Sequence, residues 1–307
     1  MFRTVVVPLD GSPLAEHALA TATMLAERAG AEVRLVRAHH PILNDLGDQL
    51  LMEQVMREEA QDYLNRTASG IQHETGMAPG TALLEGPPAH AVCEYLRDLD
   101  QPLLVMSTHG RTGFSRAWMG SVADAVVRNT ATPVLLLRPD EAPGGVLPPI
   151  GPFERMLVPL DGSDHAEQVL ASALPLAELT GAQVLLLEVV KPVFIPAFTP
   201  AAEYGVAYAP PSEFAADATH AQADRAADYV SSLAIKLRGE HPTLDVQSEV
   251  RTEPAPATAI LETARAQGSD IVALATHGRG MSRLMVGSVA DKVLRAGPRA
   301  MLVVRPR

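Results

Sequence analysis

The sequence has a single cysteine, Cys93, and aromatic residues make up only 4% of its 307 residues. One cysteine cannot form a disulfide within the chain, which is typical of a protein that works in the reducing cytoplasm. No apolar run approaches the roughly 20 residues that a membrane-spanning helix needs. The short apolar run that ends at Pro8 is too brief for a signal peptide. We therefore expect a cytoplasmic protein without a membrane partner.

Basic charge is also scarce, because 25 lysines and arginines stand against 36 acidic residues and give a formal net charge of -11. Such a chain repels a phosphate backbone overall, so we do not expect nucleic acid as its main partner. A small anionic ligand remains compatible with this charge, because backbone N–H groups bind phosphate whatever the net charge.

The sequence does contain an internal repeat. The segment 5–12, Val-Val-Val-Pro-Leu-Asp-Gly-Ser, returns at 156–163 as Met-Leu-Val-Pro-Leu-Asp-Gly-Ser. The motif Ser-Thr-His-Gly-Arg returns as Ala-Thr-His-Gly-Arg, and the segment 120–124, Gly-Ser-Val-Ala-Asp, returns unchanged at 287–291. Matches in the same order indicate a duplicated domain.

The repeat predicts a first domain at 1–139 and a second at 154–307. Between them, residues 140–153 are rich in proline and glycine and resemble a linker. The second copy is longer than the first, and we place its insertion in the proline-rich stretch 191–211. This insertion could form a lid, a dimer contact or an irregular loop.

Each copy alternates short apolar runs with longer amphipathic segments. Unbroken apolar strands between helices are typical of a parallel sheet covered on both faces, and right-handed crossovers restrict it to a doubly wound α/β fold. In the first copy we expect strands at 4–7, 32–38, 81–84, 103–106 and 134–137, and helices at 12–29, 48–73, 87–99 and 120–129.

Two loops follow strand ends where such a sheet binds ligands, namely 8–12 and 107–121. Gly110 allows close approach of a ligand to the backbone. Gly120 and Ser121 open a helix, whose free N–H groups and dipole favour an anion. Asp10 suits a metal ion on phosphates or hydrogen bonds to a ribose. On spacing alone, a purely structural role for the glycine-rich loop stays open.

Together these features resemble the universal stress protein family, over essentially the whole chain. The resemblance implies, in each copy, a five-stranded parallel sheet of strand order 3-2-1-4-5 with helices on both faces. The family's nucleotide-binding pattern, Gly-x2-Gly-x9-Gly-Ser/Thr, falls on Ser107-x2-Gly110-x9-Gly120-Ser121 and on Ala275-x2-Gly278-x8-Gly287-Ser288.

The resemblance further implies a stress-response switch that binds ATP with Mg²⁺ and hydrolyses it slowly at most. Asp10 and Asp161 would meet the magnesium ion through the bound nucleotide. The first site would comprise Pro8, Asp10, Ala38, Met106, Ser107, Gly110, Gly120, Ser121 and Val122. The second would comprise Pro159, Asp161, Val189, Leu274, Ala275, Gly278, Gly287, Ser288 and Val289.

The chain departs from the family pattern in both copies. Ser107 and Ala275 replace the first glycine, which narrows the approach to the loop. The second loop is also one residue shorter, so we expect its donors to be displaced. These differences predict that the first copy binds ATP more tightly.

Two other functions compete with the switch. A module that has lost its nucleotide and acts through protein–protein contacts is supported by the same departures from the pattern. An adenylate-forming enzyme of the wider nucleotide-hydrolase class would need a Ser-Gly-Gly loop after the first strand. Asp10-Gly11-Ser12-Pro13 stands there instead, so we rank this class low.

Several polar residues near these loops have simpler explanations than catalysis. His109 and His277 have no neighbouring partner in sequence and are expected to order their loops. We expect His39 and His40 in a solvated loop, and Cys93 in the core. Four arginines could clamp phosphates or only meet solvent: Arg111, Arg116, Arg279 and Arg283.

The last strand of each copy needs cover, since an exposed apolar edge invites pairing. In the family resembled here, fifth strands commonly pair across a dimer. We therefore expect Val134–Leu137 and Met301–Val304 to pair within the chain as a pseudo-dimer. Whether two chains also form a homodimer stays open.

Overall fold

The computed structural model describes residues 1–40, 49–108, 119–139, 149–194, 212–278 and 286–306. Strands and helices alternate throughout, as the sequence predicts. The first half contains β1 (Thr4–Pro8), α1 (Pro13–Glu16), α2 (Ala18–Ala29), β2 (Glu32–His39), α3 (Gln49–Thr75), β3 (Gly80–Glu85), α4 (Pro88–Arg97), β4 (Pro102–Ser107), α5 (Ser121–Asn129) and β5 (Val134–Leu137). The second contains β6 (Arg155–Leu160), α6 (Asp164–Glu167), α7 (Leu170–Thr180), β7 (Gln183–Val190), α8 (Ser212–Glu240), β8 (Val246–Thr252), α9 (Pro256–Ala266), β9 (Ile271–Ala275), α10 (Ser288–Ala296) and β10 (Ala300–Val304).

The strands form one ten-stranded sheet in the order β3-β2-β1-β4-β5-β10-β9-β6-β7-β8. Each half is parallel and has the order 3-2-1-4-5, which confirms the doubly wound α/β fold. The strand order reverses beside β1 in the first half and beside β6 in the second, and ligands of doubly wound sheets bind beside such reversals at the carboxyl ends of the strands.

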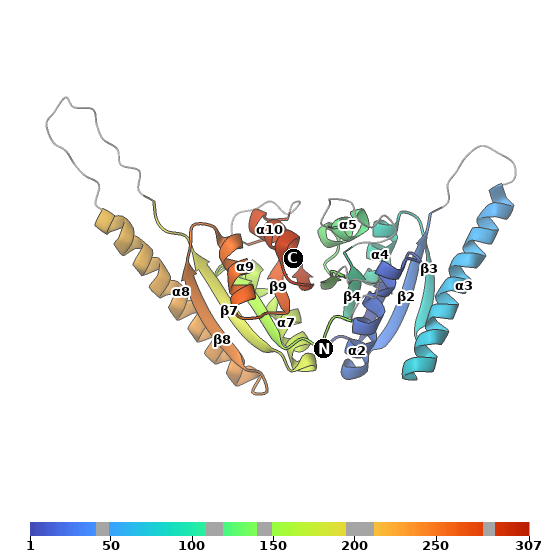
Figure 1. Ribbon diagram of the computed structural model, residues 1–307, viewed down its shortest axis with the longest axis horizontal. Coiled ribbons are helices and arrows are strands. Elements are labelled where there is room, and N and C mark those ends of the chain that lie inside the picture. The colour runs from blue at the N-terminus through green and yellow to red at the C-terminus, as the bar shows by residue number, and fades with distance from the viewer. Residues whose placement is uncertain (41–48, 109–118, 140–148, 195–211, 279–285, 307) are drawn as a thin grey trace, which may run out of the picture.

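The two half-sheets meet at their fifth strands. β5 and β10 pair antiparallel, with Val134 opposite Val303 and Leu137 opposite Ala300. This confirms the predicted pairing within the chain. In Figure 1 the two halves form an open V around this seam, with α3 and α8 on the outer flanks.

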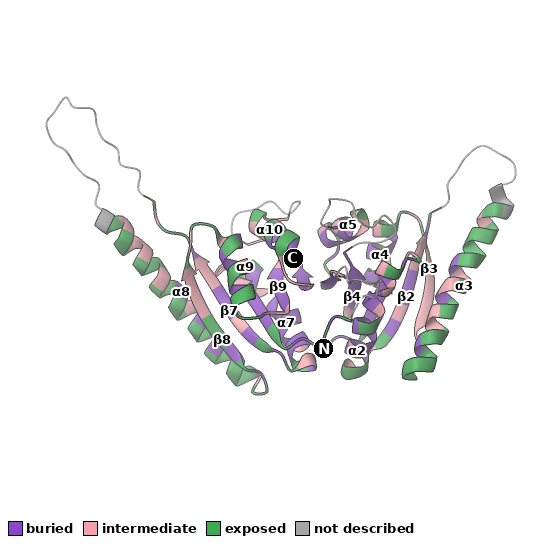
Figure 2. Ribbon diagram, viewed as in Figure 1, coloured by how far each residue is buried: buried purple, intermediate pink, exposed green. Residues whose placement is uncertain are grey.

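Helices cover both faces of the sheet, and each face has a core that runs through both halves. Leu35, Leu135 and Leu302 belong to the core under α2, α3, α7 and α8. Leu104 and Val272 belong to the core under α4, α5, α9 and α10. The buried residues therefore line the inner faces of all the helix layers (Figure 2).

A side-chain cap sets the start of α1 as the sequence predicts. Ser12 accepts a hydrogen bond from the backbone N–H of Ala15, and Pro13 opens α1. Gly30 ends α2 in the left-handed conformation, with φ 62°. None of the helices in the described ranges is both long and apolar enough to cross a bilayer.

One expectation about polar residues is wrong. His39 does not lie in a solvated loop but is the last residue of β2 and is buried, whereas His40 is exposed. The strand continues past Ala38 because the ladder with β3 extends to the pair His39 and Glu85. Cys93 is buried on α4, as expected, and burial raises the pKa of its thiol.

Candidate functional site

A cavity of about 980 Å³ opens at the strand reversal of the second copy. It lies at the carboxyl ends of β6, β7 and β9, between α8 on one side and the starts of α9 and α10 on the other. All nine residues predicted for the second site line this cavity: Pro159, Asp161, Val189, Leu274, Ala275, Gly278, Gly287, Ser288 and Val289.

Asp161 is held in place by the turn that follows β6. Its Oδ1 accepts hydrogen bonds from the backbone N–H of Ser163 at 3.1 Å and from the Ser163 hydroxyl at 2.5 Å. Gly162 between them has φ 70°, a conformation that favours glycine. Because Ser163 also caps α6, the carboxylate is fixed to the start of a helix.

Gly278 packs directly against this carboxylate. A Cβ at position 278 would overlap Asp161 Oδ2 and lie 3.0 Å from its Cγ. Since the other oxygen of Asp161 is held by Ser163, the carboxylate cannot easily yield. The glycine therefore brings backbone and carboxylate together at one wall of the cavity.

The start of α10 forms the next part of the wall. Gly287 donates its N–H to the carbonyl of Thr276 at 2.8 Å, and the exposed Ser288 begins the helix. In the first copy Gly120 makes the same bond to Thr108, with φ −64° and ψ 152° against −60° and 148° for Gly287. The backbone at the helix start is thus alike in the two copies, while the rest of the shortened loop, where we expect displaced donors, lies outside the described residues.

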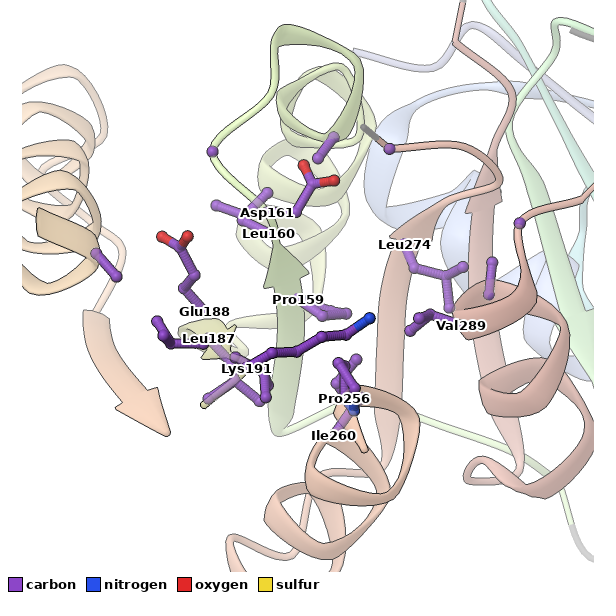
Figure 3. Close-up of a pocket in the computed structure, with 18 of the residues that line it drawn as sticks. Pro159, Leu160, Asp161, Leu187, Glu188, Lys191, Pro256, Ile260, Leu274 and Val289 are labelled. Atoms are coloured by element: carbon purple, nitrogen blue, oxygen red, sulfur yellow. The ribbon is translucent and has the colours of Figure 1, made fainter. Parts of the chain in front are cut away.

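The cavity also contains polar residues that the sequence reasoning did not select. Glu188 from β7 and Lys191 just after it enter from the same side, and Figure 3 shows Lys191 reaching across toward Leu274 and Val289. The long helix α8 adds three further polar residues: Gln222, Arg225 and Tyr229. Glu188 was detectable in principle, because it interrupts an otherwise apolar strand.

Tyr229 connects α8 to the acidic side of the cavity. Its hydroxyl donates a hydrogen bond to Glu167 at 2.9 Å. Burial raises the pKa of Tyr229 most, followed by this hydrogen bond and by the charges of Glu188 and Asp161. The tyrosine therefore stays neutral among three carboxylates.

The first copy repeats this framework where it is described. Asp10 Oδ1 accepts from the backbone N–H and the hydroxyl of Ser12 at 2.9 and 2.6 Å, and Tyr63 donates to Glu16 at 2.7 Å. The carboxyl ends of β1, β2 and β4 and the start of α5 supply the predicted residues in the described part: Pro8, Asp10, Ala38, Met106, Ser107, Gly120, Ser121 and Val122. Gly110, His109, Arg111, Arg116, Arg279 and Arg283 lie outside the described residues.

His277 bonds to its neighbour through Nδ1, which lies 2.8 Å from the Thr276 hydroxyl. This fits the expected role in ordering the loop. In the part of the chain that the structure describes, no group of three or more His, Cys, Asp or Glu side chains could hold a metal by itself. A metal at this site would need further ligands, such as phosphate oxygens.

The model of the universal stress protein family matches residues 1–138 and 152–305. The chain therefore belongs to the universal stress protein family and contains two of its domains in tandem.

Curated relatives and solved structures agree with this assignment. A universal stress protein of Methanocaldococcus jannaschii is 32% identical over 142 residues, which cover 45% of this chain and 83% of the relative. One from Thermus aquaticus is 32% identical over 140 residues, 45% of this chain and 100% of the relative. The crystal structure of a universal stress protein from Archaeoglobus fulgidus has a TM-score of 0.67, with 19% identity and 98% of both chains covered, and shares the fold.

Proposed function

We propose that the chain is a switch in the stress response that binds ATP or a related adenine nucleotide in each copy, together with Mg²⁺. The observation that supports this most is the cavity of about 980 Å³, which gathers nine residues chosen from sequence alone. Cavities of 300 to 1,000 Å³ with apolar walls and a few fixed polar groups are typical of small-molecule sites.

The chemistry of the cavity suits a nucleotide. Free N–H groups at the start of α10 and the Ser288 hydroxyl are donors for phosphate oxygens. Leu274 would provide apolar surface over the nucleoside, and the backbone at Val189, near the end of β7, would meet the base. Asp161 offers a carboxylate on the phosphate side, so it fits as one ligand of Mg²⁺ that phosphate oxygens would also hold. The bound ion would neutralise part of the phosphate charge.

We propose at most slow hydrolysis. His277 Nδ1 is occupied by its contact with Thr276, and Asp161 Oδ1 is held by Ser163. These contacts hold both side chains in their loops, and the sequence motifs offer no evident general base, whereas efficient phosphoryl transfer needs a positioned base or water-orienting group. Nucleotide occupancy, rather than turnover, would then set the state of the protein.

Further parts of the proposal concern organisation. We propose domains at 1–139 and 154–307 with a linker at 140–153, and a cytoplasmic location supported by the reduced, buried Cys93. The pairing of β5 with β10 supports a pseudo-dimer within each chain. The tighter site remains, in this proposal, that of the first copy.

Two matched variants of the full chain test nucleotide binding. Ser121→Glu and Ser288→Glu each place a carboxylate at an exposed first position of a helix, where the dipole favours it. Stability should hold or rise slightly, while a bound phosphate would be repelled. We expect calorimetry with ATP and Mg²⁺ to show a loss of at least about tenfold in affinity at the altered site. Unchanged binding in the double variant would contradict the proposed site.

The interaction module without nucleotide is the second candidate. Ala275 at the first glycine position and the shortened second loop favour it. Under this alternative, millimolar ATP and Mg²⁺ would leave the melting temperature of the wild-type chain unchanged, whereas a ligand that binds only the folded state must raise it.

A further inference from the structure

Arg138, the residue directly after β5, forms hydrogen bonds with the end of α10 in the other copy. Its guanidinium donates to the carbonyls of Leu294 at 2.8 Å and Gly297 at 3.1 Å, and its backbone N–H donates to the carbonyl of Arg299 at 2.7 Å. Carbonyls at a helix end carry partial negative charge, which suits a half-buried arginine. The first copy therefore anchors the end of α10, while the start of α10 lines the cavity of the second copy.

The end of β5 is also bonded to the candidate site of the first copy. Leu137, which precedes Arg138, accepts a hydrogen bond from the N–H of Thr108 at 2.8 Å. The Thr108 carbonyl in turn accepts one from the N–H of Gly120 at 2.6 Å, and Gly120 is the N-cap residue of α5. A continuous series of bonded groups within the described ranges thus joins the end of α10 to the start of α5.

The second copy has the same bonds at its own fifth strand. The carbonyl of Val304 accepts from the N–H of Thr276 at 2.9 Å, and the carbonyl of Thr276 accepts from the N–H of Gly287 at 2.8 Å. Since β5 and β10 pair with each other, the starts of both helices, α5 and α10, are tied to the two strands of one seam.

Ion pairs provide a second link between α5 and α10. Arg128 pairs with Asp124 within α5 at 2.8 Å, and Arg295 pairs with Asp291 within α10 at the same distance. The hydrogen bond to Asp124 raises the pKa of Arg128 most, and the charge of Asp291 in the other copy adds to it. These side chains are about a third to a half exposed, so water and salt screen them. We therefore expect the hydrogen bonds of Arg138 to be the stronger link.

The bond between Gly120 and Thr108 defines two local states of the first copy. In the closed state the bond is formed, and in the open state the start of α5 has separated from the strand end. Native proteins open locally in such units, and a ligand that orders one part of a unit lowers the cost of ordering the rest. An anion bound at the start of α10 would hold this helix in place, together with the carbonyls to which Arg138 donates.

We infer that the two copies are coupled: a ligand in the second cavity stabilises the closed start of α5 in the first copy, and Arg138 transmits this effect. The inference rests on the proposed function, because it assigns a regulation to the same two sites. By linkage, a ligand in the first site favours binding at the second by the same factor. The chain would then respond to nucleotide over a narrower range of concentration than two independent sites allow.

Hydrogen exchange in the full Ser121→Glu chain tests this inference, because ATP with Mg²⁺ can then fill only the second site. We expect ATP to slow the exchange of the Thr108 and Gly120 amides by at least about fivefold, the lower end of typical coupling between sites. Gly86 supplies the matched control amide. It is also a partly buried glycine, and it donates to the carbonyl of His39 at 2.9 Å beside β3, the far edge of the sheet. Its exchange should not change, whereas a general rise in stability would slow all three amides.

Substitution of the transmitting residue completes the test. Arg138→Met in the Ser121→Glu chain should remove the slowing at Gly120, while calorimetry still shows binding of ATP. Arg3→Met, which removes an exposed ion pair, should leave the slowing intact. Circular dichroism checks that each variant is folded. If Arg138→Met does not fold, Arg138→Lys replaces it, because lysine keeps the charge but lacks the forked donors, and it should reduce the slowing.

The outcomes separate this inference from the proposed function. The inference is overturned, and the proposed function stands, if ATP binds but leaves the Gly120 amide unaffected. The same holds if ATP slows Gly86 as much as Gly120, or if the slowing persists in the folded Arg138 variant. If the wild-type chain does not bind ATP, both fail.

Discussion

At the scale of single residues, the candidate site is built from bonds that hold carboxylates in fixed positions. Asp161 and Asp10 are each fixed by a serine that also caps a helix. Gly278 then packs against Asp161 without room for a side chain. These contacts are formed within the protein itself, so the geometry of the wall exists before any ligand arrives, which lowers the cost of ordering on binding.

The two tyrosines predict a specific dependence on pH. Burial and the hydrogen bonds to Glu16 and Glu167 raise the pKa of Tyr63 and Tyr229 above the usual value of about 10. A raised pKa in the folded state means that their stabilisation is complete below pH 10 and is lost as the pH rises further. Urea unfolding between pH 8 and 11 should show this loss, and the double variant Tyr63→Phe/Tyr229→Phe should show a smaller one.

Absorbance of tyrosinate gives an independent measurement. The chain has five tyrosines, and in the native protein Tyr63 and Tyr229 should ionise at higher pH than the same residues in urea. Identical titration curves for the native and the unfolded chain would show that these tyrosines are not protected.

Residue types in the motif were predictable, but not every side chain that faces the cavity. Asp161, Gly278 and Ser288 follow from strand ends and helix starts, which sequence patterns reveal directly. Glu188 and Tyr229 were missed. The periodicity of a strand or helix indicates which of its faces is buried, but not which element packs against that face. His39 was placed wrongly for the same reason, since its burial depends on pairing with β3.

At the scale of elements, one arginine of the first half forms hydrogen bonds with the end of a helix in the second half. Arg138, just after β5, donates to the carbonyls of Leu294 at 2.8 Å and Gly297 at 3.1 Å, which close α10. Its own N–H bonds to the carbonyl of Arg299 at 2.7 Å. The helix whose start lines the cavity is therefore held at its other end by the opposite half of the molecule.

Removing the hydrogen bonds of Arg138 should measurably lower the free energy of unfolding. Arg138→Met loses charged hydrogen bonds to the carbonyls at the end of α10, and we expect the free energy of unfolding to fall by about 2 kcal/mol. Arg3→Met is the matched control, because Arg3 pairs with Asp100 at 2.7 Å with both side chains largely exposed and should contribute less than about 0.5 kcal/mol. Equal effects of the two variants in urea titrations would show that the Arg138 hydrogen bonds contribute little to stability.

Element boundaries were predicted closely where local signals exist. The helix expected at 48–73 is α3 (Gln49–Thr75), and Ser12 with Pro13 marks the start of α1. The end of the predicted linker behaves differently: Ile150 and Phe153 are buried, and the Ile150 carbonyl accepts from the Thr21 hydroxyl at 2.5 Å. Composition indicates a loose segment, but it cannot show that another helix packs over it.

At the scale of the whole molecule, the sheet and both cores are continuous across the two copies. Leu302 of β10 is fully buried opposite Leu135 of β5. Damage to the seam should therefore spread to both halves, and we expect the wild-type chain to unfold in one cooperative transition.

A substitution in the second copy can test this from the first. Leu302→Ala should cost about 2 to 5 kcal/mol by leaving a cavity in the core. Cys93, the only cysteine of the chain, is buried on α4 in the first copy, so its exposure to a thiol reagent reports the unfolding of that copy. We expect the midpoint of this exposure in urea to fall together with that of circular dichroism. Ile235→Ala, at a side chain 63% exposed on α8, should shift neither. A midpoint of Cys93 exposure that Leu302→Ala leaves unchanged would show that the copies unfold separately.

The antiparallel seam between β5 and β10 also bears on how this protein can evolve. In a dimer of identical chains, every mutation appears in both sites at once, because one gene encodes both. Here the two halves are parts of one chain. Dilution therefore cannot separate them, and they are always present in equal amounts. A difference such as Ser107 in the first copy against Ala275 in the second can then persist on one side only. Because the two halves belong to one chain, they need not be identical, and each half can change in sequence independently of the other.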